Sequence, residues 1–546
     1  MDLLRLLASE AEDRGFRLFC AASIAGIVNS LLVAIIINAS KTAGSNNGNF
    51  QLLLFFLITF IALFYSRKYF LVETGNITER LMNSIRLRLV DKIRSTSLPF
   101  IENTGKSELY TAITHSTFAL TTSSTALISA LSAAIMLVFA AGFIAILSFT
   151  AFKISLAFIG VGVVYFLWIS KKVEKKLAES TRKENEFQGL LDHVFGGFKE
   201  LKMSRKRSND LFENFITNIS KEARDLKIET NNHLAVMNIF GVSFSYGLIA
   251  VIVFLLPIFS SAETKNIPQI SSAVLFILGP ISEVVAAVTH YLKCNEAIDN
   301  IKKVEKLLDA AKMENTNVSA NSGVNLSNFK SLDASGISYT YTNKLVEKKG
   351  FSIGPLNFRL NSREIIFIVG GNGSGKSTLL KLLTGLYIPN TGEIRYNNKL
   401  VNEAQLQKYR HLFSTIFTDF HLFDRMYGMR KKNKGKLEKW LTELRIDDKT
   451  GYEEDRFTNT NLSTGQRKRL ALAVSLVERK PILVFDEVAA DQDPEFRNHF
   501  YTTLLPQLRD LGHSIIAVTH DEHYFHTADK ILKMHDGHWT NYKPRT

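Results

Sequence analysis

Residues 365–378 decide the fold of the C-terminal half: Ile365-Ile-Phe-Ile-Val369 runs directly into a glycine-rich nonapeptide. A continuous apolar run of this length is typical of a buried strand in a parallel sheet. The nonapeptide fits G-x-x-x-x-G-K-[ST], in which backbone N–H groups surround phosphate oxygens at the start of a helix. Its residues are Gly370, Gly371, Asn372, Gly373, Ser374, Gly375, Lys376, Ser377 and Thr378. We expect Lys376 to reach the β- and γ-phosphates of a nucleotide and Ser377 to bind Mg²⁺.

A second apolar run ends in two carboxylates. Ile482-Leu-Val-Phe485 is followed by Asp486 and Glu487. Ligands bind at the carboxyl ends of strands in open α/β sheets, so these side chains are expected beside the phosphate loop. We predict that Asp486 holds Mg²⁺ through water. Glu487 is predicted to polarise the water that attacks the γ-phosphate.

The pentapeptide Leu462-Ser463-Thr464-Gly465-Gln466 lies between these two elements. This order of motifs resembles the nucleotide-binding domain of ABC (ATP-binding cassette) ATPases. The resemblance implies that Ser463, Gly465 and Gln466 serve the ATP bound by a partner domain, with a hydroxyl, a backbone N–H and a helix N-terminus near the γ-phosphate. Because the chain carries one such cassette, the resemblance also implies a homodimer.

Other positions match the family as well. The resemblance implies that Tyr341 stacks on adenine and that Asp493 is the aspartate of the D-loop. His520 follows the apolar stretch 514–519 and matches the switch histidine that contacts the γ-phosphate. The alternative for a lone histidine is a buried structural residue. Lys376, Glu487 and His520 are therefore the candidate catalytic residues, with ATP and Mg²⁺ as cofactors.

Two departures from the family pattern refine the assignment. Thr464 replaces the common glycine, and the segment Phe417–Phe423 lacks the glutamine that senses Mg²⁺ and the membrane loops. Thr418 or Asp419 must serve instead, or that coupling contact is altered. Together with Ala489–Pro494, the segment resembles bacterial exporters of cyclic peptides, including siderophore precursors and microcin-type peptides. This resemblance implies ATP-driven export of a cyclic or modified peptide.

The N-terminal half is apolar. Mean hydropathy over all 546 residues is only +0.04, which hides two different halves. Six runs are long enough to span a bilayer core, which needs about 20 residues; the alternative is four spans and two buried helices. The predicted spans are 17–39, 50–72, 122–148, 151–170, 234–258 and 268–292. The third and fourth are joined by a short turn around Phe149–Lys153.

The loops indicate orientation. The long loops 73–121 and 171–233 are basic, whereas 40–49 and 259–267 are short and nearly uncharged. Basic loops remain in the cytoplasm, so both termini and the ATPase domain are predicted to be cytoplasmic at a bacterial inner membrane. The long loops read as helices, which resembles the ABC exporter fold. In that fold the loop tips, here near Thr96–Lys106 and Gly196–Ser208, would press on the ATPase.

The predicted architecture is a six-helix all-α transmembrane domain, 1–310, a linker, 311–330, and an α/β P-loop ATPase domain, 331–546. We attribute the net charge of +14 to basic residues that flank the spans at the lipid bilayer interface, not to nucleic-acid binding. Cys20 and Cys294 are not expected to form a disulfide. In the last span, Glu283 either faces a cargo cavity or pairs with a neighbouring helix.

Three alternatives remain open at this point. A lipid or multidrug exporter would share the ATPase motifs, and so would a siderophore importer built on the exporter fold. A non-transporting ABC ATPase is a different class, and it would lack the six predicted spans.

Overall fold

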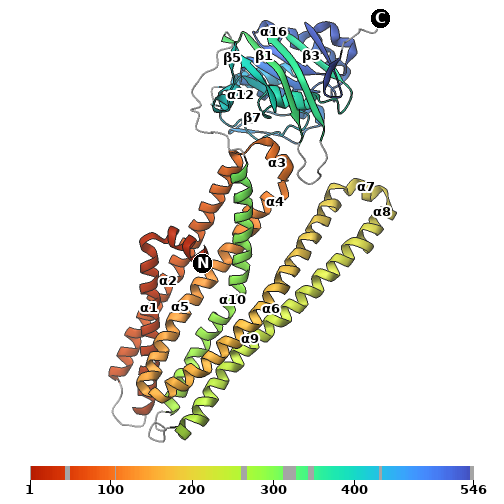
Figure 1. Ribbon diagram of the computed structural model, residues 1–546. Helices are drawn as coiled ribbons and strands as arrows, with labels where there is room; N and C mark the ends of the chain where they lie inside the picture. The colour runs from red at the N-terminus through yellow and green to blue at the C-terminus, as the bar shows by residue number, and fades with distance from the viewer. Residues whose placement is uncertain are drawn as a thin grey trace. The chain divides into compact units, whose positions relative to one another are not determined.

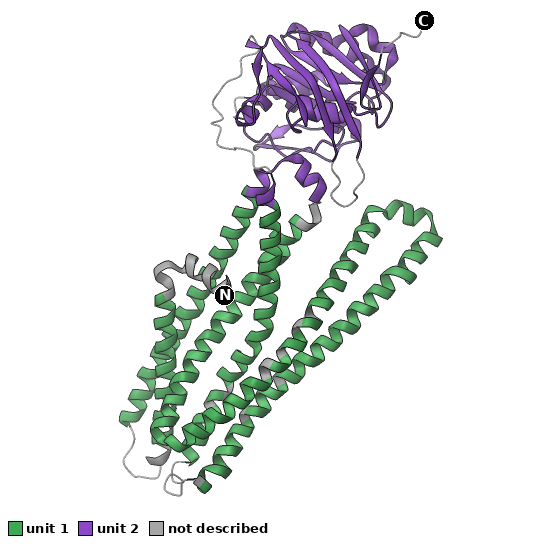
Figure 2. Ribbon diagram, in the orientation of Figure 1, with its two compact units in different colours: residues 1–91, 107–307 green, residues 92–106, 308–546 purple. Residues whose placement is uncertain are grey.

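The computed structural model describes residues 2–42, 50–104, 106–259, 267–311, 328–341, 350–429 and 433–540. It divides into two compact units, coloured separately in Figure 2. Unit 1 comprises residues 1–91 and 107–307, and unit 2 comprises 92–106 and 308–546. Most of the predicted linker, 312–327, lies outside the described residues.

The secondary-structure elements of unit 1 are all helices in its described residues. Its long helices are α1 (Asp2–Thr42), α2 (Phe50–Arg94), α5 (Thr117–Leu147), α6 (Phe149–Gly196), α9 (Thr217–Phe259) and α10 (Ile267–Ala310). Short helices α4 (Lys106–Thr111), α7 (Phe198–Met203) and α8 (Arg205–Asp210) and π-helical turns at Ala112–Ser116 and Leu211–Ile216 complete it. Figure 1 shows α6 and α9 side by side, with α7 and α8 at their tip. The predicted continuation of the spans into long helices is confirmed.

Five helices among the described residues are long and apolar enough to cross a membrane: Phe16–Ala39, Phe50–Arg94, Leu109–Leu147, Arg205–Ile258 and Ile267–Ala310. The described apolar part of the predicted span 151–170 is the shorter segment Phe149–Tyr165. The most apolar window of α2 has no buried residue, as expected of a helix whose side chains face lipid. Helices suit this environment because their backbone groups are satisfied internally.

The break between α5 and α6 falls at Ser148, so the prediction of a turn over Phe149–Lys153 was wrong. Ser148 is extended, with φ −161°, and its Oγ accepts a hydrogen bond from the Ala151 backbone N–H at 3.0 Å. A serine N-cap satisfies a donor that has no partner within the helix. One residue therefore suffices to end one helix and start the next.

Unit 2 contains two main sheets. The first is mostly parallel, in the order β12 (His538–Thr540), β11 (Lys530–His535), β3 (Ile365–Gly370), β10 (Ser514–Val518), β9 (Ile482–Asp486) and β6 (Phe413–Ile416), with β12 antiparallel. The second is antiparallel, in the order β2 (Ser352–Asn361), β1 (Ser331–Thr340), β4 (Thr391–Tyr396) and β5 (Lys399–Leu400). A small hairpin pairs β7 (Tyr452–Glu453) with β8 (Arg456–Phe457).

Helices cover both faces of the parallel sheet. The helices of the ATPase region are α11 (Lys376–Leu383), α12 (Leu406–Arg410), α13 (Lys434–Glu443), α14 (Thr464–Val477), α15 (Pro494–His499) and α16 (Leu505–Asp510), with short turns at Glu403–Gln405, Phe500–Leu504 and Glu522–Thr527. Unit 2 also contains the short helix α3 (Leu98–Thr104). In β3, Phe367 packs in a core with Leu470 of α14, whereas Ile368 packs in a second core with Leu380 of α11. The continuous apolar run of β3 is explained by burial on both faces.

Candidate functional site

The phosphate loop connects β3 to α11. Gly373 and Gly375 have φ of +76° and +104°, a region that glycine enters without strain. A Cβ on Gly375 would lie 2.7 Å from Cγ2 of Ile353, so a larger residue would also clash. The Lys376 ammonium donates to the carbonyls of Gly370, at 2.9 Å, and Gly371, at 3.0 Å. Two of its three donors are thereby used, and one remains for a phosphate oxygen.

The electrostatics of the loop suit an anion. Lys376 is buried, and burial lowers its pKa while Glu487 and Asp486 oppose that effect. The hydroxyl of Ser374 is also buried and has no hydrogen-bond partner among the described residues. A buried polar atom without a partner is costly. A nucleotide phosphate would supply a partner for it, so the residues present fit ATP.

Asp486 and Ser377 meet as the sequence predicted. Asp486 ends β9 with 2% of its surface exposed. Its Oδ2 accepts one hydrogen bond from Ser377 Oγ at 2.9 Å and another from Thr418 Oγ1 at 3.1 Å. Burial raises the pKa of Asp486, and these two hydrogen bonds oppose the rise. A carboxylate beside a hydroxyl fits Mg²⁺, which prefers one or two protein oxygens together with phosphates and waters.

The missing glutamine has a structural counterpart. Thr418, not Asp419, supplies the hydroxyl that reaches Asp486. The same loop contacts α14, since the Arg467 guanidinium lies 6.0 Å from the ring centroid of Phe420. The segment that departs from the family pattern is therefore anchored to the candidate metal carboxylate by a shorter side chain.

Glu487 and His520 are also brought together. His520 Nε2 lies 3.0 Å from Glu487 Oε1, and both side chains are partly exposed. Glu487 has φ of +53°, which is uncommon for a residue with a side chain. Its backbone is held by a hydrogen bond from Glu487 N to Val518 O and by one from the buried Lys468 Nζ to Glu487 O. Strained backbone that is held in this way clusters at functional sites.

The pentapeptide Leu462–Gln466, called the signature segment below, leads into α14. Ser463 Oγ accepts from the Gln466 backbone N–H, and Gln466 Oε1 accepts from the Ser463 N–H, which is a complete capping box. Gly465 is required by close packing, because a Cβ would lie 2.7 Å from the Asp491 carbonyl oxygen. Gln492 Nε2 donates to the Gly465 carbonyl at 3.0 Å.

Tyr341 follows β1. Its hydroxyl lies 3.1 Å from Thr378 Oγ1 of the phosphate loop. Asp493 N-caps α15 and forms an ion pair with Arg469. Sequence reasoning missed Lys468, Gln492 and Tyr387. Gln492 belongs to a segment that stands out as unusual, whereas no sequence pattern singles out Lys468 or Tyr387.

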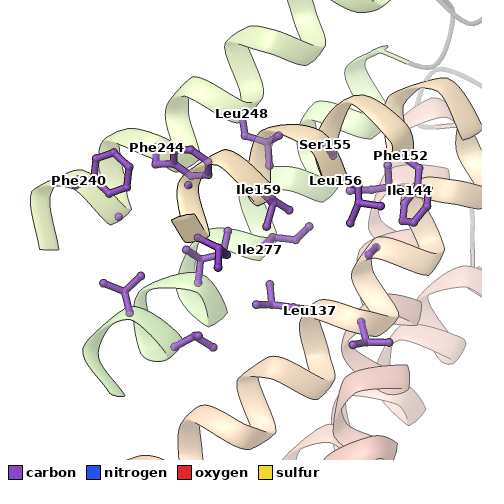
Figure 3. A pocket seen from close by; sticks show the side chains of 18 residues that line it. Leu137, Ile144, Phe152, Ser155, Leu156, Ile159, Phe240, Phe244, Leu248 and Ile277 are labelled. Atoms are coloured by element: carbon purple, nitrogen blue, oxygen red, sulfur yellow. The ribbon is translucent and has the colours of Figure 1, made fainter. Parts of the chain in front are cut away.

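Unit 1 holds an apolar cavity of about 400 Å³ between α5, α6, α9 and α10. Figure 3 shows Phe240, Phe244, Leu137 and Ile277 around it. Among the described residues that line it, Ser155 alone has a polar side chain. Glu283 does not line this cavity; its carboxylate lies 3.7 Å from Arg67 Nη2 on α2, as the neighbouring-helix alternative expects.

Comparisons with known proteins agree with this geometry. A family model described as ABC transporter matches residues 353–490. The chain is 32% identical over 468 residues to the ATP-binding protein SyrD of Pseudomonas syringae pv. syringae, covering 84% of this chain and 82% of that protein. It is 32% identical over 195 residues to the spermidine/putrescine import ATP-binding protein PotA of Trichodesmium erythraeum (strain IMS101), covering 33% of this chain and 50% of that protein.

The similarity to SyrD extends well beyond the ATPase unit, because 468 residues cannot be accommodated within 328–546. The fold resembles a solved bacterial Atm1-family ABC exporter with ATP bound, with a TM-score of 0.72 and 16% identity over 97% of this chain and 95% of that chain. An α-helical membrane domain thus precedes a nucleotide-binding domain. The chain belongs to the ABC transporter family, as an exporter-type half-transporter that couples ATP hydrolysis to transport.

Proposed function

We propose that this protein exports a cyclic or modified peptide across the bacterial inner membrane as a homodimer, with ATP and Mg²⁺. The observation that carries the proposal is the segment Phe417–Asp424, in which Thr418 takes the place of the family glutamine and bonds to Asp486. Together with Ala489–Pro494, it resembles the cyclic-peptide exporter branch. The positive loops flanking the apolar helices support an inner-membrane location with the ATPase unit in the cytoplasm.

The geometry supports specific roles in hydrolysis. Lys376 would bind the β- and γ-phosphate oxygens, with the backbone N–H groups of 370–378 around them. Ser377 and Asp486 would hold Mg²⁺, and the metal when bound would neutralise phosphate charge. Glu487 would accept the proton of the attacking water, and His520, 3.0 Å away, would orient that carboxylate and contact the γ-phosphate.

The signature segment supports the homodimer. The start of α14 presents a hydroxyl and backbone N–H groups at a positive helix end, an arrangement suited to an anion. In a dimer, Ser463 and Gly465 would approach the ATP held by the partner. Ser463→Arg in one subunit of a tethered dimer should impair hydrolysis at the partner's P-loop, and unaffected partner hydrolysis would argue against the shared site.

The apolar cavity supports a cargo with apolar groups. Its volume lies within the range of ligand pockets, about 300–1,000 Å³, and Phe240 and Phe244 supply aromatic surface. We assign it to apolar side chains of the peptide. Phe244 already lies against Gly162, so the larger ring of Phe244→Trp would extend into the cavity and should reduce transport.

The test is ATP-driven uptake into inside-out membrane vesicles, with a panel of cyclic peptides, a fluorescent lipid and cationic dyes. Accumulation of a peptide, absent in the Glu487→Gln variant, supports the proposal. Accumulation of the lipid or dyes alone supports a lipid or multidrug exporter. Peptide or siderophore movement only in right-side-out vesicles, into the lumen, supports an importer, and either of these outcomes refutes peptide export.

A further inference from the structure

The short helix α3 contacts the ATPase core through Leu98 and through one carboxylate, that of Glu102. Residues 92–106 belong to unit 2, so the contact lies within one compact unit. Glu102 Oε1 lies 2.8 Å from Lys381 Nζ on α11, and Glu102 Oε2 accepts a hydrogen bond from the Tyr387 hydroxyl. Leu98 packs against the same core. Both oxygens of Glu102 are therefore committed to residues that follow the phosphate loop.

Tyr387 connects this contact to the nucleotide site. It is 1% exposed, and its ring stacks on Tyr339 with centroids 4.7 Å apart. The Tyr341 hydroxyl donates to the Tyr387 hydroxyl at 3.4 Å, and the two rings meet edge to face at 5.9 Å. Tyr341 also meets Thr378 of the phosphate loop. A continuous series of contacts thus runs from Thr378 through Tyr341 and Tyr387 to Glu102.

The direction of the hydrogen bonds is defined. Burial, followed by the hydrogen bond to Glu102, raises the pKa of Tyr387. Its hydroxyl therefore stays protonated at neutral pH and always has a proton to donate to the carboxylate. Tyr341 donates to the Tyr387 oxygen, and Tyr387 donates its single proton to Glu102. A shift of Tyr341 therefore removes a donor from the Tyr387 oxygen and changes the position from which Tyr387 donates to Glu102.

We propose that Tyr387 is a positioning residue that couples occupancy of the adenine position at Tyr341 to α3 through Glu102. The proposal rests on the proposed adenine contact of Tyr341. It gives this chain a coupling route on the base side of the nucleotide. On the phosphate side, the glutamine that serves this purpose in the family is replaced by Thr418.

Coupling between two sites is reciprocal in binding free energy. If ATP binding favours one position of α3, a change at Glu102 must alter the affinity for ATP. This holds although Glu102 lies 239 positions before Tyr341 in the chain and touches no predicted phosphate ligand. A general loss of packing would weaken every ligand of the phosphate loop. Interrupting a route on the base side should weaken the binding of ATP and leave the binding of a ligand without a base unchanged.

The experiment measures equilibrium binding of ATP, and of tripolyphosphate as a competitor, to the full-length protein in nanodiscs with EDTA present to prevent hydrolysis. Tyr387→Phe and Glu102→Met should each weaken ATP binding about fivefold, the low end of typical coupling. The double variant should be no weaker than either single variant, because both interrupt one route. Glu102→Gln, which retains an acceptor oxygen, should restore affinity.

Controls separate the possible failures. Asp309→Asn removes a comparable ion pair, to Lys92 at 2.7 Å, and should leave ATP binding unchanged. Unaltered ATP affinity in Tyr387→Phe, additive losses, or equal weakening of tripolyphosphate would each overturn the coupling. If Tyr341→Ala itself leaves ATP binding intact, the proposed adenine contact is wrong. If it weakens binding while Tyr387→Phe does not, only the route to α3 is refuted.

Discussion

Replacing Thr418 with valine tests whether this threonine substitutes for the missing glutamine. Asp486 is buried, and its Oδ2 receives two hydroxyl hydrogen bonds, from Ser377 at 2.9 Å and from Thr418 at 3.1 Å. Valine preserves the branched shape and removes one of the two. A hydrogen bond to a charged group contributes about 1.5–3 kcal/mol. The ionised carboxylate is therefore destabilised, and the pKa of Asp486 should rise further.

The expected consequence concerns Mg²⁺. Loss of a residue that orients a metal ligand typically costs about 10–100-fold in metal affinity or activity. We expect the Mg²⁺ concentration for half-maximal ATP hydrolysis to rise about tenfold, with the acid limb of the pH–rate profile moved to higher pH. The assay is the initial rate of hydrolysis in nanodiscs at saturating ATP over a MgCl₂ series, repeated across pH.

Matched variants make the result interpretable. Thr384→Val removes a buried hydroxyl whose acceptors are the Leu380 and Lys381 carbonyls of its own helix, so it should leave the Mg²⁺ dependence unchanged. Thr418→Gln introduces the residue typical of the family and should recover most of the affinity. An unchanged Mg²⁺ dependence in a Thr418→Val protein that still unfolds at the wild-type temperature would refute the assignment.

Three further predictions concern the same site. Glu487→Gln should retain ATP binding but lower kcat by about 10²-fold or more, measured as single-turnover hydrolysis; full activity would remove its role as base. Asp486→Asn should abolish Mg²⁺-dependent hydrolysis yet raise the thermal midpoint in EDTA. Because burial raises the pKa of Asp486, the folded state loses stability as pH rises through that pKa and the carboxyl group ionises. The asparagine amide does not ionise and avoids this loss; a thermal midpoint below that of the wild type at neutral pH would contradict this. Gly465→Ala should lower kcat roughly tenfold to a hundredfold by displacing the Asp491 carbonyl, while Gly435→Ala, in open space, should not; equal rates would refute the packing argument.

The parts of the fold that the sequence predicts are those with a local cause. The phosphate loop needs glycines at defined positions, and β3 needs apolar residues on both faces, so both are visible in one short stretch. Asp486 was placed correctly beside Ser377 because parallel strands end at one edge of a sheet. The helical continuation of the spans follows from apolar periodicity in 77–97.

Other features depend on contacts between distant segments. The hydrogen bond from Tyr387 to Glu102 joins residues 285 positions apart, and no periodicity in the sequence predicts it. The sequence predicts the break between α5 and α6 a few residues too late, because the hydrogen bond by which Ser148 caps α6 determines where that helix begins. Thr418 and Asp419 are adjacent polar residues, and only the path of the backbone after β6 determines that Thr418 reaches Asp486.

The capping box at Ser463 bears on how the signature segment can serve a partner's nucleotide. A serine hydroxyl has one donor and two acceptor positions. Capping α14 uses an acceptor position, since the Gln466 N–H donates to Ser463 Oγ, and the O–H remains as a donor. Helix capping and phosphate binding are therefore compatible in one side chain, and the cap fixes the hydroxyl oxygen at the positive end of the helix.

The structure also gives Gln466 a contact within its own segment. Its side-chain oxygen accepts the Ser463 N–H, so Gln466 holds Ser463 in place at the start of α14. Gln492 completes the arrangement from the other side: Arg469 Nε donates to its Oε1 at 2.8 Å, and its Nε2 donates to the Gly465 carbonyl. The segment Ala489–Pro494 and the signature segment are thus held together within one subunit. A change at Gln492 would therefore reach the signature segment through the Gly465 carbonyl, although Gln492 itself is not among the residues expected at ATP.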